Sequence, residues 1–561
     1  MKNKKKNGEM PRYKYTVSFL LCIFMVAFPL VSGIKIKEIM VISVALCGLA
    51  WFIGENIFPD NVLKKTPIRN KNKYIWIFTG IFVALSLLSE VFSKDYGHEF
   101  DAFNNEYESL SVLIGYLIIF LLAYNYFYLD KSIKVFKFTI LILSGVVVLM
   151  SVAEFFNLSV ALLWVHSRET LENTNRVMLN FGNSNYYGAF CCMLLPFTLE
   201  LYLWAKDRIN RIAGLILNTG LIFCIVVSKS TLDFYLMIAV VIYILICERK
   251  QVMKNIKYLI FFAIVLIVSF LLINILSDGR LNKLMGVSAL NKDSFVETDN
   301  EVYELKKIDM SGNRLTIYGE ESSLSIVFDK NIAFYDSDNK MLDFVSSNNK
   351  ITFSYEEYKN VKITLAHIGG TNKISVEIDL GYKDTLDFYI IEGRFYGVGV
   401  NGDGIDNIGK EYTYSRFDSM FTGRGYIWSR TIPKLKEVLL IGKGTGKFIY
   451  NYEQYDYVGL VKTHGTHKVI INRPHNIILQ YCMDIGIPAT LSLICIVIYV
   501  LINGFIKRKV NDAETEWLAH SSFISVITFC GYSMLNDSLV ILSPYMWIFL
   551  GINLAIQFNE K

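Results

Sequence analysis

The stretch YLIFFAIVLIVSFLLINIL at residues 258–276 contains no charged side chain. An α-helix rises about 1.5 Å per residue, so about 20 apolar residues cross the roughly 30 Å hydrocarbon core of a bilayer. This stretch therefore predicts a membrane-spanning helix. Together with this stretch the chain has twelve windows of the same kind, at 15–32, 38–55, 74–92, 110–128, 134–153, 185–204, 212–228, 232–247, 258–276, 484–505, 519–536 and 540–557.

The composition of the whole chain points the same way. Of its 561 residues 53% are hydrophobic and 19% are charged, and the mean hydropathy is +0.37. Soluble domains carry about 25% charged residues. These values exclude a disordered chain, a nucleic-acid-coating protein and an ordinary cytosolic enzyme. The net charge of +5 is too small to indicate a polyanionic partner, so we expect no nucleic acid.

Lysine and arginine are distributed unevenly between the gaps that separate these windows. If the N-terminus is cytoplasmic, 25 of these residues lie on that side, in the two chain ends, in the gaps and at the start of the window 134–153, whereas the short gaps on the other side hold six. Positive residues concentrate on the cytoplasmic side of membrane proteins. The bias predicts a multi-pass plasma-membrane protein with both termini cytoplasmic. It also places the long segment 277–483 outside the cell.

Within this long segment the hydrophobic period changes from helical to alternating. Leu324, Ile326 and Phe328 recur at every second position, and similar runs begin at Ile351 and Ile374. A period of two is typical of strands that bury one face. About eight or nine short strands, spaced by roughly 8–12 residues, predict a small β-sandwich or barrel.

The fold class that follows is an α-helical polytopic membrane protein with about twelve transmembrane helices and a small all-β extracytoplasmic domain between helices nine and ten. We expect helices 1–9 in 1–276, the β-rich insertion in 277–417 with its core at about 290–405, a mixed segment at 418–483, and helices 10–12 in 484–561. The external segment has no cysteine before Cys482. The β domain must therefore rely on an ordinary hydrophobic core.

Several ionisable residues lie near the predicted outer face. Arg424, Arg430, Arg473 and His475 belong to the segment that returns to the membrane, and Lys229 belongs to a very short external turn. Arginine grips phosphate bidentately, and histidine exchanges a proton near neutral pH. Together they could hold a lipid-linked pyrophosphate and activate a hydroxyl against the attached sugar. Taken singly, each cation is more simply explained as an anchor to lipid headgroups, and the histidine as a structural residue.

Two other patterns indicate weaker alternatives. His464, His467 and His475 suggest zinc, but their spacing fits no strong zinc template and no cysteine or acidic partner accompanies them, so we expect no metal. The run Gly442-Lys-Gly-Thr-Gly446-Lys is similar to a phosphate-binding loop in composition only, because the Gly-Lys-Ser/Thr ending is missing.

Three stretches carry a family resemblance. FTGRGYIWSRTIPKLKEVLLIGKGTGKF at 421–448 and NRPHNIILQYCMDIGIP at 472–488 resemble the signature region of the O-antigen ligase and polymerase superfamily. NFGNSNYYGAF at 180–190 resembles the asparagine-rich entry to a middle helix of that family. With the twelve windows and the large external loop, the resemblance covers most of the chain. The β-rich insertion resembles the Gram-positive version of the family.

The resemblance implies a cell-envelope glycosyltransferase. Such an enzyme transfers a glycan from undecaprenyl pyrophosphate to an acceptor hydroxyl at the outer face of the plasma membrane, with inversion and without metal, nucleotide or other cofactor. Its partners are the lipid-linked glycan donor, a glycan or glycolipid acceptor, and membrane lipid. Arg424 matches the family arginine that neutralises the pyrophosphate, and His475 matches the histidine that activates the acceptor hydroxyl or orients the leaving group.

We therefore expect His475 and Arg424 to be catalytic, and Lys229, Arg430, Arg473 and Asn476 to bind substrate. One position departs from the family pattern, because the arginine that the family places at the end of a middle span is Lys229 or Thr231 here, depending on the alignment. Lysine can bind phosphate as a point charge. Arg168 or Arg176 could also compensate.

Two alternatives belong to other functional classes. A flippase for lipid-linked sugars would also have about twelve spans, but it should carry charges near the membrane midplane. The predicted spans are nearly uncharged inside, which favours chemistry at the surface. The second alternative is a non-catalytic envelope protein whose β domain binds glycan. The sequence does not distinguish a ligase from a polymerase, and it does not identify the sugar.

Overall fold

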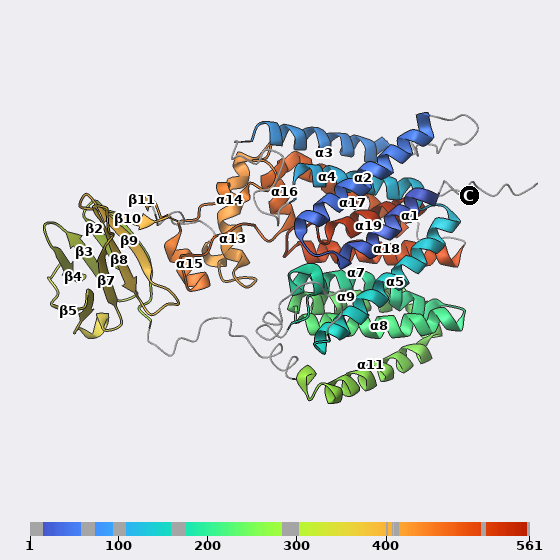
Figure 1. Ribbon diagram of the computed structural model, residues 1–561, viewed down its shortest axis with the longest axis horizontal. Coiled ribbons are helices and arrows are strands. Elements are labelled where there is room, and N and C mark those ends of the chain that lie inside the picture. The colour runs from blue at the N-terminus through green and yellow to red at the C-terminus, as the bar shows by residue number, and fades with distance from the viewer. Residues whose placement is uncertain are drawn as a thin grey trace, which may run out of the picture. The chain divides into compact units, whose positions relative to one another are not determined.

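The computed structural model of the protein describes residues 15–57, 73–93, 108–158, 176–282, 302–399, 402–406, 408, 415–506 and 512–557. The described chain is mostly helical, with a separate β region in which all strand pairs are antiparallel (Figure 1). It divides into two compact units. Unit 1 comprises Met1–Leu290, Glu437–Lys447 and Asn476–Lys561, and unit 2 comprises Asn291–Lys436 and Phe448–His475.

Each apolar window of the sequence overlaps a helix of unit 1. The helices are α1 (Thr16–Ala27), α2 (Ile34–Ile57), α3 (Lys73–Val91), α4 (Leu110–Tyr126), α5 (Asp130–Phe155), α7 (Ser184–Trp204), α8 (Arg208–Ser228), α9 (Thr231–Cys247), α10 (Arg249–Lys254), α11 (Ile256–Leu276), α16 (Ile477–Ile485), α17 (Ile487–Ile506), α18 (Ala513–Ser533) and α19 (Ser543–Gln557). The window expected at 484–505 starts three residues too early. Gly486, with φ of 89°, separates α16 from α17, and a side chain there would meet the backbone of Ile441 at 2.9 Å.

Several of these helices could span a membrane. Within the described ranges, seven are long and apolar enough by length and composition: Ile34–Ile57, Lys73–Val91, Asp130–Phe155, Ser184–Trp204, Arg208–Ser228, Ile256–Leu276 and Ile487–Phe505. Thr16–Leu30, Leu110–Tyr126 and Thr231–Cys247 are shorter apolar stretches. The apolar window of α11 is only 6% buried by protein, although its mean hydropathy is 3.1, so its side chains need a non-aqueous environment.

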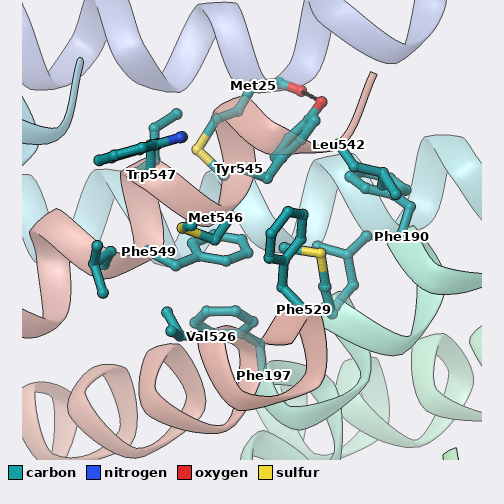
Figure 2. Packing of buried hydrophobic residues seen from close by; sticks show 14 of the residues in the cluster. Met25, Phe190, Phe197, Val526, Phe529, Leu542, Tyr545, Met546, Trp547 and Phe549 are labelled. Atoms are coloured by element: carbon teal, nitrogen blue, oxygen red, sulfur yellow. Dashed lines mark hydrogen bonds between the residues drawn. The ribbon is translucent and has the colours of Figure 1, made fainter. Parts of the chain in front are cut away.

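Helix α7 lies at the centre of unit 1, with 94% of its apolar window buried. Figure 2 shows its side chains Phe190 and Phe197 packed with the aromatic residues of α19. The ring centroids of Phe190 and Tyr545 are 4.7 Å apart, and those of Phe197 and Phe549 are 5.1 Å apart. Buried tyrosine needs a polar partner, and the Tyr545 hydroxyl donates to the carbonyl of Met25 at 2.8 Å.

The β region contains a four-stranded and a seven-stranded sheet. The first has the order β1 (Lys307–Ser311), β2 (Arg314–Tyr318), β3 (Ser323–Phe328), β4 (Ile332–Tyr335). The second has the order β11 (Gly404–Ile405), β10 (Arg394–Val398), β9 (Leu386–Ile391), β8 (Lys373–Asp379), β7 (Lys362–His367), β6 (Lys350–Phe353), β5 (Phe344–Ser347). Alternate residues of both sheets enter one apolar core, as the period of two predicts; Leu386, Phe388 and Ile390 of β9 are examples.

Three short helices complete unit 2: α13 (Arg424–Thr431), α14 (Phe448–Asn451) and α15 (Tyr457–His464). Helix α13 changes to a 3₁₀ helix at Ile432–Glu437. Pro433 has no N–H and cannot continue the α-helical hydrogen bonds, which explains the change. Helix α15 joins the β region, because Tyr457 and Val461 belong to its core.

Candidate functional site

A pocket of about 250 Å³ lies entirely within unit 2. It is formed by the N-terminal end of α13, the C-terminal end of α15 and the segment that leads to α16. The lining residues are Thr422, Gly423, Arg424, Ile427, His464, Val469, Ile470, Ile471, Asn472, Arg473 and His475. The pocket therefore brings together three residues expected from the sequence, Arg424, Arg473 and His475. Arg424 lies more than 45 positions before the other two along the chain.

Arg424 occupies the first position of α13 and follows an unusual turn. Phe421, Thr422 and Gly423 have φ of 53°, 54° and 83°, which is the left-handed region. Gly425 is required for close packing, because a side chain there would lie 1.9 Å from the carbonyl oxygen of Phe417. The Arg424 guanidinium donates to the Thr422 hydroxyl at 3.2 Å. The glycines on either side of Arg424 thus build a sharp turn that delivers the arginine to the pocket.

The segment before α16 is fixed against the rest of unit 2. The side chain of Gln454 forms two hydrogen bonds with the backbone of Ile471. Its carbonyl oxygen accepts from the Ile471 N–H at 2.9 Å, and its amide nitrogen donates to the Ile471 carbonyl at 2.8 Å. The Trp428 indole donates to the Pro474 carbonyl at 2.8 Å. Arg473 is 6% exposed, and His475 has φ of 51°. These contacts hold Arg473 and His475 at the wall of the pocket.

His464 also lines the pocket, although the sequence suggested it only as a weak zinc ligand. It is the last residue of α15, and its ring packs edge-to-face on Tyr426 with centroids 5.7 Å apart. Burial lowers the pKa of His464, and the nearby charge of His475 lowers it further. His464 is therefore neutral at pH 7. In the sequence, the only local feature that marks His464 is the glycine that follows it, Gly465, which ends helix α15.

Arg430, expected to bind substrate, is engaged inside unit 2. Its guanidinium contacts Asp456 at 2.7 Å, forms a short hydrogen bond to Asp418 and lies 4.0 Å from the ring centre of Tyr426. Burial lowers the pKa of Arg430, but the hydrogen bond to Asp418 and the charge of Asp456 outweigh that effect and raise it overall. Arg430 does not belong to the lining of the pocket. In the structure its charge is balanced by protein carboxylates.

Asn476, the other polar residue expected at the site, caps α16. Its carbonyl oxygen accepts from the N–H groups of Ile478 and Leu479, each at 3.0 Å, and its amide donates to the Met534 carbonyl at 2.8 Å. This is the ordinary arrangement of an asparagine N-cap. Asn476 belongs to unit 1, so the structure uses its side chain to start a helix.

Lys229 belongs to the turn between α8 and α9 in unit 1. It has φ of 55° and ends α8, while Ser230 caps α9 and Thr231 is its first residue. Burial lowers the pKa of Lys229, and the positive charges of Arg176 and Arg280 lower it further. Lys229 is thus one of three neighbouring cations. The sequence suggested Arg176 but missed Arg280, and Arg168 lies outside the described residues.

The glycine-rich run Gly442–Gly446 holds an internal carboxylate. The N–H and hydroxyl of Thr445 donate to Glu90 of α3 at 3.0 and 2.9 Å, and the Lys447 ammonium pairs with the same carboxylate at 3.0 Å. Both charged side chains are almost fully buried, at 1% and 3% exposure. Thr445 of the loop and the adjacent Lys447 therefore bind a carboxylate of the protein itself.

The three histidines of the suggested zinc site do not share one place. His464 and His475 line the pocket, whereas His467 packs on Tyr457 with ring centroids 4.2 Å apart and lies 4.0 Å from Asp387. In the part of the chain that the structure describes, no group of three histidine, cysteine or acidic residues could hold a metal ion. No protein-family model, curated protein or solved structure matches the chain.

Proposed function

We propose that the chain is an integral-membrane glycosyltransferase. It transfers a glycan from undecaprenyl pyrophosphate to an acceptor hydroxyl at the outer face of the plasma membrane, as an O-antigen ligase or polymerase does. The observation that carries this proposal is the pocket of unit 2, where two guanidinium groups and two imidazoles line one cavity of about 250 Å³. The apolar helices of unit 1 supply the membrane context.

The pocket has the electrostatic character that a departing pyrophosphate needs. When the sugar leaves, negative charge builds up on the bridging phosphate oxygen, and fixed positive groups stabilise that charge. Arg424 and Arg473 stay charged at any physiological pH and match the geometry of phosphate oxygens.

In this proposal twelve helices cross the membrane, both termini are cytoplasmic, and unit 2 is extracellular. The charge distribution of the sequence supports this topology. Lys229, which neighbours Arg176 and Arg280, is the cation of unit 1 that we propose for binding a substrate phosphate. Arg430 and Asn476 support the site through the contacts described above and are not assigned a substrate contact.

The test uses purified protein in liposomes with undecaprenyl-pyrophosphate-linked glycan and a glycan acceptor. Arg424→Ala and His475→Ala should each lower transfer by about 100-fold or more, because each removes a group that acts on the transition state. Arg394→Ala and His367→Ala are matched controls, since both residues are exposed in the β region. They should transfer like the wild type.

Folding has to be measured alongside transfer. All four variants should elute as the wild type does on size exclusion and should unfold at a similar temperature. Transfer that persists in a folded Arg424→Ala or His475→Ala variant removes that residue from the mechanism. If glycan transfer persists in both folded variants, the pocket is not the site of transfer.

A further inference from the structure

His464 is the second histidine that lines the pocket, beside His475. His464 Nδ1 is buried and has no hydrogen-bond partner among the described residues. This leaves Nε2 as the nitrogen available to a ligand. It lies on the side of Gly423, because a side chain built at that glycine would come within 3.8 Å of it. Gly423 therefore keeps open the space next to this nitrogen.

The surroundings of His464 are mostly cationic or apolar. Arg424 faces the pocket from α13, and Arg473 and His475 face it from the segment before α16. Tyr426 of α13 packs against the ring. No carboxylate lines this pocket in the described chain, so no acidic side chain of the pocket holds His464 in its charged form in the resting protein. A neutral imidazole among cations is a proton acceptor.

We propose that His464 is the general base that takes the proton from the acceptor hydroxyl. This inference rests on the proposed function and deepens it. In the step, the acceptor O–H bond breaks and its proton moves to His464 Nε2, while the acceptor oxygen forms a bond to the anomeric carbon of the sugar. The bond from that carbon to the pyrophosphate oxygen breaks, and its electron pair stays on the pyrophosphate. Arg424, Arg473 and His475, which line the same pocket, act on the leaving group.

The position of His464 at the end of α15 suits this role. The unpaired carbonyl groups at a helix C-terminus carry partial negative charge and stabilise a nearby cation. An imidazolium that forms at His464 during the reaction is stabilised there. After transfer the proton passes to water at the open side of the pocket, and the neutral form returns.

The test compares His464→Ala and His464→Gln with the matched control His367→Ala. Both His464 variants should lower kcat about 100-fold or more, which is the usual contribution of a general base, with little change in the binding of undecaprenyl pyrophosphate. Added imidazole should restore part of the activity of His464→Ala only. Because the pKa of His464 is lowered, the kcat/KM of the wild type should stay high below pH 6.5 and fall only at more acid pH. This acid limb should be absent in both variants.

Several results would overturn the inference. One is a folded His464→Ala variant with the kcat of the wild type. Another is a loss of activity in which the acid limb persists and donor binding is lost, because that pattern indicates a structural role. If Arg424→Ala is inactive while His464→Ala is active, only the role of His464 fails. If the wild type transfers nothing, the proposed function fails with it.

Discussion

His475 and Lys229 share a left-handed backbone, with φ of 51° and 55°. Each non-glycine residue in this region costs about 1–2 kcal/mol, and such residues cluster at functional sites. Phe421 and Thr422, just before Arg424, adopt the same conformation. The sequence identified His475, Lys229 and Arg424 by residue type. It could not reveal the left-handed backbone at His475, at Lys229 and in the turn before Arg424, because residues other than glycine seldom adopt it.

Arg430 shows how residue type alone can mislead. An arginine near a predicted membrane surface suggests phosphate binding, and the sequence offered no sign that Asp418 and Asp456 approach it. Asp456 lies 26 positions away and reaches Arg430 only because α13 and α15 pack together. Gly459 permits that packing, since a side chain there would lie 2.7 Å from the Arg430 guanidinium.

Arg430→Met should destabilise unit 2 by about 3–5 kcal/mol, because it leaves Asp456 buried without a counter-charge. The side chains of Arg430 and Asp456 are only 3% and 5% exposed. The measurement is the free energy of unfolding in denaturant, with the exposed Arg416→Met as control. A Met variant as stable as the wild type that no longer binds undecaprenyl pyrophosphate would instead support the substrate contact expected from the sequence.

At the scale of elements, α15 connects the β region to the pocket. Its first residue, Tyr457, is 1% exposed in the β core, and its hydroxyl donates to the Val398 carbonyl at 2.7 Å. Its last residue, His464, lines the pocket. The alternation of apolar residues was sufficient to predict strands, but it did not show that the β strands share unit 2 with residues 418–436 and 448–475. A short helix such as α15 gives too few turns for its apolar face to be recognised.

Replacing residues 307–405 by a flexible linker should abolish transfer. The loss of these strands would expose Tyr457 and Val461, which are each 1% exposed in the intact chain. Burial of such side chains contributes about 1.5–3 kcal/mol each, so α15 should lose its position and His464 with it. The measurement is transfer, together with proteolysis of the segment 448–475. Full transfer by the shortened chain would show that the pocket folds without the β region.

At the scale of the whole molecule, hydropathy predicted where the helices of unit 1 lie, because long apolar runs are the strongest signal in a sequence. It could not predict their internal polar contacts. The pairing of Lys447 with Glu90 joins residues separated by more than 350 positions, and only the folded chain brings them together. The pocket was predictable as a set of residues, Arg424, Arg473 and His475, but not as a cavity that also includes His464.

In the proposed function, the pocket of unit 2 breaks the bond between a glycan and undecaprenyl pyrophosphate. The most direct measurement follows the lipid product in liposomes that contain purified protein, lipid-linked glycan and acceptor. We expect undecaprenyl pyrophosphate to be released in the same molar amount as glycan is transferred, and not with Arg424→Ala. If the intact lipid-linked glycan instead crosses the bilayer and no undecaprenyl pyrophosphate is released, the protein is a flippase and the proposed transfer is contradicted.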